Sequence, residues 1–223
     1  MVSAGLNNLF GEVIWFYPES NSSVVNRMVA YNYFDSSTRR PVWTVGSLAR
    51  TMWRDSAVFG KPHALEYDAS TDTSFDVVGN TEGRTSYYEH ETGTDQNRNG
   101  TITAITANIS SGDFDITQRI ARGATTGTAD LRGDGEFLMK IRRFVPDFIS
   151  QTGATRVTLE LRNFPNDSQA SSALGPFDVT SSTQKVDTRA RARAIALKVE
   201  NTAASQSWKL GTFRLDIQPD GRR

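Results

Sequence analysis

Apolar and polar residues alternate in short stretches along most of the chain. The clearest case is 156–162, where Val157, Leu159 and Leu161 alternate with polar and charged neighbours. Alternate side chains of a strand share a face, so this pattern predicts a strand with one side in a core. Stretches rich in β-branched and aromatic residues predict further strands at 13–17, 27–33, 41–46, 64–67, 85–91 and 137–145. A weak helical pattern at 48–55 lacks capping residues, and we predict an all-β fold.

A change in composition near Gly93 divides the chain into two parts. Before it, short strands with polar turns predict an antiparallel meander, a pattern found in propeller blades, sandwiches and barrels. Beyond it we expect about six strands, a number typical of a small sandwich, with 165–176 as a loop. The predicted domains are a propeller-blade-like meander at 1–92 and a β-sandwich-like domain at 93–223. Three tryptophans of the first domain predict a compact aromatic core: Trp15, Trp43 and Trp53.

The stretch 186–199 has an unusual pattern. Arg189, Arg191 and Arg193 alternate with alanines, and apolar residues follow them at the same spacing. As a single strand, this stretch has one face that changes from cationic to apolar. We expect its apolar half to pack against the strand predicted at 213–217, and its cationic half to meet solvent, another subunit or a polyanion. The candidates for a subunit interface or channel lining are Arg142, Arg143, Arg189, Arg191 and Arg193, together with the terminal Arg222 and Arg223.

Overall charge limits what these arginines can bind. The chain has 223 residues, with 25 basic and 25 acidic side chains and a formal net charge of zero. Dedicated nucleic-acid binders usually carry a basic excess, so contact with DNA is expected to be transient. The chain has no cysteine, which excludes disulfides and thiolate metal sites. The first ten residues do not resemble a signal peptide and no stretch approaches ~18 apolar residues, so we expect no export signal and no membrane insertion.

Three patterns that suggest chemistry have simpler interpretations. The sequence DQNRNG at 95–100 matches half of a calcium loop, but Thr106 stands where a bidentate acid is needed, which favours an Asn-Gly hairpin turn. His90 lies between Glu89 and Glu91, but in a strand these acids point away from it and no nucleophile motif accompanies it, so it is expected to be solvated. Asp113 and Asp115 lie on one face of a predicted strand and are interpreted as turn formers, not as a glycosidase pair. The sequence predicts no catalytic residue, cofactor or metal.

Several segments together resemble one protein family. The segment VWTVGSLARTMWRD at 42–55, preceded by the aromatic strand at 13–17 and by Tyr31-Asn32-Tyr33, is similar to the C-terminal part of tail structural proteins of short-tailed bacteriophages. These are proteins of the nozzle or packaged-DNA stabilisation type. The likeness covers nearly the whole chain from Glu12 onward. It continues through 111–116, 142–147, 188–191 and 208–223.

The resemblance implies a non-enzymatic component of the virion tail. Such proteins usually form a ring of six around the DNA exit channel, below the portal and adaptor, with a propeller-like part and an appended β domain. The implied partners are further copies of the chain, the adaptor, other nozzle or fibre proteins and, transiently, the double-stranded genome, which the ring helps to retain and eject. Two alternatives stay open: a receptor-binding tail or fibre module that contacts host surface glycans, and a polysaccharide depolymerase with a paired-carboxylate cleft.

Overall fold

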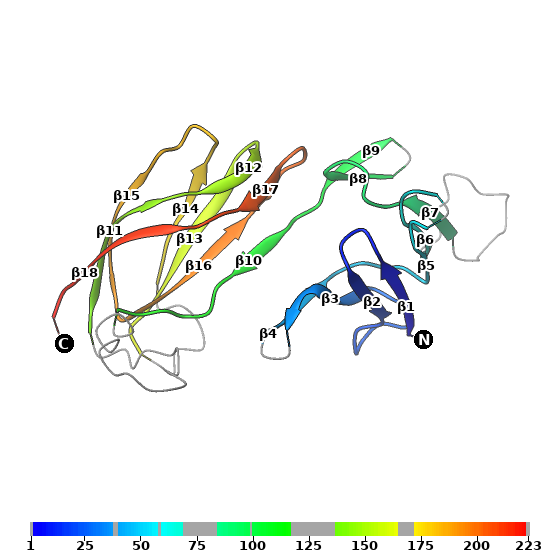
Figure 1. The fold of residues 1–223 in the computed structure, drawn as a ribbon, viewed down its shortest axis with the longest axis horizontal. Helices are drawn as coiled ribbons and strands as arrows, with labels where there is room; N and C mark the ends of the chain where they lie inside the picture. The colour runs from blue at the N-terminus through cyan, green and yellow to red at the C-terminus, as the bar shows by residue number, and fades with distance from the viewer. Residues whose placement is uncertain are drawn as a thin grey trace. The chain divides into compact units, whose positions relative to one another are not determined.

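The computed structural model of the chain describes residues 2–37, 40–57, 59–68, 84–98, 100–116, 137–164 and 172–221. These residues form strands and no helix, which confirms the all-β prediction. Within this described part, no helix could therefore cross a membrane. The chain divides into two compact units, Met1–Gly93 and Thr94–Arg223, one residue from the predicted domain boundary. Figure 1 shows the strands of each unit.

The first sheet of unit 1 is an antiparallel meander. Its strands are β1 (Ser3–Asn7), β2 (Glu12–Tyr17), β3 (Arg27–Ser37) and β4 (Arg40–Gly46), and each pairs with the next along the chain. Alternation along β2 turns Ile14 and Phe16 to one side, where they are buried with Val25 and Ala30. The small apolar core of unit 1 thus lies on one side of this sheet.

A second sheet of unit 1 contains β5 (Met52–Arg54), β6 (His63–Asp68) and β7 (Arg84–Glu89), in that order. The stretch 48–55, with its weakly helical or irregular pattern, forms no helix: it is irregular up to Thr51, and Met52–Arg54 pair with β6 as a short strand. Trp53 of this strand packs on the core of unit 1, and its indole Nε1 donates a hydrogen bond to the Leu6 carbonyl at 2.8 Å. A Cβ at Gly5 would overlap this indole, so the close packing of Trp53 on β1 requires glycine there.

The prediction of a compact tryptophan core is wrong for two of the three residues. Trp53 packs on the core, but Trp15 and Trp43 lie together with ring centroids 6.2 Å apart, and Trp43 is 54% exposed. The cause is strand alternation. Trp15 follows Ile14 on β2 and therefore points to the opposite side of the sheet from the core.

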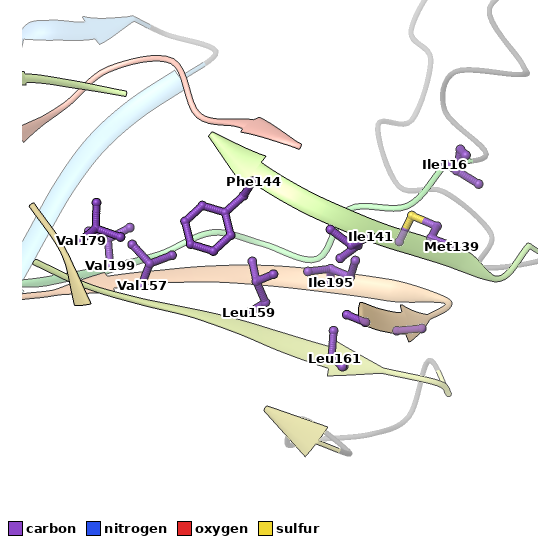
Figure 2. Packing of buried hydrophobic residues seen from close by; sticks show 12 residues of the cluster. Ile116, Met139, Ile141, Phe144, Val157, Leu159, Leu161, Val179, Ile195 and Val199 are labelled. Atoms are coloured by element: carbon purple, nitrogen blue, oxygen red, sulfur yellow. The ribbon is translucent and has the colours of Figure 1, made fainter. Parts of the chain in front are cut away.

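Unit 2 contains two principal sheets that share one core. One sheet has the order β10 (Asn108–Ser110), β16 (Ala194–Glu200), β13 (Thr155–Arg162) and β14 (Ser172–Val179). The other has β15 (Val186–Ala192), β11 (Met139–Val145) and β18 (Arg214–Pro219). Figure 2 shows how side chains of both sheets meet, with Phe144 and Ile141 of β11 near Leu159 of β13. This arrangement agrees with the predicted sandwich-like domain.

Two smaller strand pairs also belong to unit 2. These are β8 (Asp95–Arg98) with β9 (Thr101–Ala104), and β12 (Phe148–Thr152) with β17 (Ser207–Leu210). Arg98 lies opposite Thr101, so the predicted hairpin at DQNRNG is confirmed, and Gly100 has the positive φ of 84° that such a turn favours.

The prediction of a single strand at 186–199 is wrong. The chain bends at Arg193 and passes from β15 in one sheet to β16 in the other. The buried residues change phase across this bend, from Ala190 and Ala192 before it to Ile195 and Val199 after it. Arginines and apolar residues therefore do not share one face. The apolar half does share its core with Phe213, Leu215 and Ile217, as expected.

Two further expectations for unit 2 need correction. The loop predicted at 165–176 extends too far, because β14 begins at Ser172 and pairs with β13 across a register shift. Asp113 and Asp115 do not lie on a strand. They flank Phe114, which forms an isolated bridge with Ile195.

Candidate functional site

Six cationic side chains lie on the outer side of the β15-β11-β18 sheet, which we call the basic face. Strand alternation places them there, because Met139, Ile141 and Phe144 of β11 are fully buried and the residues between them point outward. On β15, Ala190 and Ala192 face the core in the same way. The members of the basic face are Lys140, Arg142, Arg143, Arg189, Arg191 and Arg214.

A β-bulge brings two of these arginines to the same side. Consecutive residues of a regular strand point to opposite faces, but the register of β11 shifts between Ile141 and Arg143 against both neighbouring strands. Ile141 and Phe144 can then both face the core, with Arg142 and Arg143 outside. The buried hydroxyl of Thr188 donates to the Ile141 carbonyl at 3.2 Å, so it satisfies an acceptor where the ladder is irregular.

Three aspartates lie among the cations and pair with two of them. Arg143 Nε is 3.5 Å from Asp187 Oδ1 and 3.7 Å from Asp216 Oδ2. Arg191 Nε is 2.6 Å from Asp220 Oδ2. The face is therefore mixed in sign, with cations in excess.

The other four cations of the basic face have no ion-pair partner among the residues that the structure describes. They are Lys140, Arg142, Arg189 and Arg214. Lys140 lies directly opposite Arg191 in the ladder, and like charges in such a cross-strand pair are destabilising. An anionic partner would relieve this repulsion.

The outer side of the opposite sheet differs, because its cations are paired. Arg156 lies 3.3 Å from Asp178, and Lys198 lies 2.7 Å from Glu200. Arg162 lies 3.0 Å from Asp113. Among the described cations of the two principal sheets, those without an ion-pair partner thus all lie on the basic face.

The structure brings together four of the seven arginines that the sequence singled out. Arg193 is separate: it occupies the bend between the sheets, is half-buried, and its backbone N–H donates to the Arg162 carbonyl at 3.1 Å. Arg222 and Arg223 lie outside the described residues. Sequence reasoning missed Lys140 and Arg214. Lys140 lies two residues before Arg142 on β11, so strand alternation alone could have placed both side chains on one face.

In unit 1, the edge strand β4 exposes apolar side chains on both of its faces, and we call it the apolar edge. Every residue from Arg40 to Val45 is exposed, including Trp43 at 54% and Val45 at 73%. Trp43 also contacts Tyr31, with ring centroids 4.8 Å apart. Exposed edge strands are open to pairing and apolar contact with another chain.

A buried charged network holds the segment that connects the two sheets of unit 1 to the second of these sheets. Arg50 is 5% exposed, and its guanidinium pairs with Glu66 at 2.9 Å and lies 4.1 Å from the centre of the Tyr88 ring. Its Nε donates to His90 Nε2 at 2.9 Å, so that nitrogen must stay unprotonated. Burial, then the Arg50 charge and the His63 charge, lower the pKa of His90 to about 4. The expectation of a solvated His90 is wrong, and its role here is structural.

Within the described part of the chain, no group of three or more His, Cys, Asp or Glu residues is placed to hold a metal ion. Comparison of the sequence with protein-family models and with curated proteins found no match.

Proposed function

We propose that this chain is a structural subunit of the tail of a short-tailed phage, of the nozzle or tail-tube type. Copies associate into a ring around the DNA exit channel and help to retain and eject the genome, next to the adaptor and other nozzle or fibre proteins. From Glu12 onward, a series of segments resembles the phage tail proteins in the same order along the chain, and this resemblance supports the phage tail assignment. The apolar edge of unit 1 is the observation that supports association.

A four-stranded antiparallel meander is the size of one propeller blade. Blades bury their apolar residues on neighbouring blades, whereas β4 leaves Val42, Trp43 and Val45 exposed. A large exposed apolar patch favours contact with another protein. We propose that a neighbouring polypeptide of the tail covers this strand.

The basic face fits a wall close to DNA or to another subunit. Its arginines could meet phosphate, and the aspartates beside them would keep that contact weak, which suits a passage through which DNA must move. A ring made by head-to-tail contacts needs two different surfaces on each copy. The basic face is one candidate for such a surface, and the apolar edge is covered separately by a neighbouring polypeptide of the tail.

Light scattering of native and variant protein tests the role of the apolar edge. We expect Val45→Asp to reduce the average mass of the native protein while its thermal unfolding stays unchanged, because Val45 is 73% exposed. Ile149→Asp is the matched control, since Ile149 is 67% exposed on unit 2. Association of Val45→Asp at the native level would count against the proposal.

A receptor-binding module is the second candidate, favoured by the exposed aromatic pair of Trp43 and Tyr31. Aromatic rings of this kind can stack on sugars. Titration of host surface glycans against tryptophan fluorescence tests it: binding that is lost in Trp43→Ala, in a protein that forms no oligomer, would favour this candidate over the nozzle.

A further inference from the structure

The zero net charge of the chain hides an opposite charge on each unit. Unit 1 has seven basic and eleven acidic residues, a formal charge of −4. Unit 2 has eighteen basic and fourteen acidic residues, a formal charge of +4. Each unit therefore carries the charge that would neutralise the other unit of a second copy.

Three carboxylates of unit 1 gather around the turn between β1 and β2. Glu12 ends the turn, and Glu91 accepts a hydrogen bond of 3.2 Å from the side chain of buried Asn7 at its start. Asp55 accepts from the backbone N–H of Asn8 at 3.1 Å. We call this group, Glu12, Asp55 and Glu91, the acidic end.

The acidic end has properties of a contact surface. The tip of its turn exposes Leu9 and Phe10 by 49% and 51%, so apolar side chains stand among the carboxylates. Burial, and then the charge of Glu91, raise the pKa of Glu12. Crowded carboxylates of this kind are stabilised by a cationic partner.

The basic face of unit 2 offers the complementary charge. Four of its six cations have no ion-pair partner in the part of the chain that is described, and Lys140 stands opposite Arg191. The aspartates on this face would repel phosphates. Asp187 and Asp216 could instead accept hydrogen bonds from a protein surface. A protein partner that brings carboxylates therefore fits better than nucleic acid.

We propose that the acidic end of one copy docks on the basic face of a second copy. The two surfaces differ, so the contact is heterologous and each copy keeps one surface of each kind for the next neighbour. This inference rests on the proposed function. It identifies the contact that joins each copy to the next copy around the ring.

Charge reversal combined with a salt series tests the contact in the full chain. Arg142→Glu with Arg189→Glu reverses the basic face, and we expect the association constant from sedimentation velocity to fall at least ~10-fold at low salt. The control is Arg156→Glu with Lys209→Glu, which changes net charge equally on other exposed parts of unit 2. Native association should also weaken at least ~10-fold between about 0.05 and 0.5 M salt, because salt screens exposed charges.

A mixing experiment identifies the acidic end as the partner. The variant Asp55→Asn with Glu91→Gln removes two charges of the acidic end and keeps acceptors for Asn8 and Asn7. This variant and the reversed basic face should each self-associate less than native protein. An equimolar mixture should form pairs, because the native basic face of the first variant then meets the native acidic end of the second. Unchanged melting of each variant alone shows that it folds.

The outcomes separate this inference from the proposed function. If native protein oligomerises to the same extent at every salt concentration, and both variants self-associate as strongly as native protein, the charged contact is overturned. The ring proposal then still stands. Native protein that is monomeric in all conditions overturns both. Duplex DNA serves as a further probe: tight binding to DNA that Arg142→Glu with Arg189→Glu abolishes, with self-association unchanged, assigns the basic face to nucleic acid and contradicts the inference.

Discussion

Lys140 on β11 lies directly opposite Arg191 on β15, so one cross-strand pair on the exposed side of unit 2 contains two cations. Arg191 reaches Asp220 at 2.6 Å, but Lys140 has no acidic partner among the described residues. Such a pair costs stability in the isolated chain. Its presence is understandable if the face serves to bind an anionic surface.

Lys140→Glu should therefore have opposite effects on stability and association. We expect the free energy of unfolding of unit 2 to rise by about 0.2–1 kcal/mol, because glutamate would face Arg191 across the ladder. Self-association should weaken, since the basic face loses charge. Chemical denaturation and sedimentation velocity measure the two effects, and a variant that is less stable yet associates like native protein would contradict this reasoning.

Gly5→Ala should destabilise unit 1. A Cβ at this position would overlap the indole of Trp53, and forcing atoms into a packed site costs about 1–3 kcal/mol. Unfolding followed by tryptophan fluorescence reports the loss. Gly112→Ala is the control, because a Cβ at Gly112 has no neighbour within 4 Å. Equal stability of the two variants would show that Trp53 does not pack on Gly5.

Thr188→Val should destabilise unit 2 at nearly constant volume. The substitution removes the hydroxyl that donates to the Ile141 carbonyl at 3.2 Å and leaves that buried acceptor unpaired, at a cost of about 1–3 kcal/mol. Thr158→Val, on the outer side of β13, should be nearly neutral. Chemical denaturation of both proteins makes the comparison, and the prediction fails if Thr188→Val matches native stability.

Stability of unit 1 should fall on acidification through His90. Its pKa is about 4 in the folded chain and near 6.5 when unfolded, so the unfolded state binds more protons between these values. The contribution of His90 is complete above about pH 6.5 and is lost as the pH falls towards 4. Protonation would place a cation against Arg50 in a region that also contains Glu66, His63 and Tyr88.

The His90→Gln variant isolates this effect, because glutamine keeps an acceptor for Arg50 and does not titrate. Melting temperatures at about pH 7 and pH 4.5 should differ less in this variant than in native protein. Glu12, whose pKa is raised, contributes with the opposite sign in both proteins and cancels in the comparison. If the melting temperatures of both proteins change equally with pH, His90 is not the source of the pH dependence.

Strand alternation made much of the fold predictable. Val157, Leu159 and Leu161 are buried as the pattern indicated, since a half-buried strand has a period of two. The break at Arg193 could not be predicted, because the alternation of arginine and alanine continues through it and only tertiary packing moves the chain to the other sheet. The first strand was missed because Ser3–Asn7 are mostly small or polar.

The basic face was predictable only in part. Arg189 and Arg191 share a face by simple parity, and the sequence indicated them. Arg142 and Arg143 are consecutive, so their common side depends on a bulge that sequence parity does not reveal. The acidic end needs residues far apart in the chain, and the turn between β1 and β2 gathers them through hydrogen bonds that only the folded unit supplies.

Negative-stain electron microscopy of the purified chain at low ionic strength tests the tail-subunit proposal most directly. We predict closed rings, with six copies expected from the resemblance, and a mass by light scattering several times the 24.6 kDa of one chain. Uniform monomers at every protein concentration and salt level, alone and in mixtures with other tail proteins, would contradict the proposal.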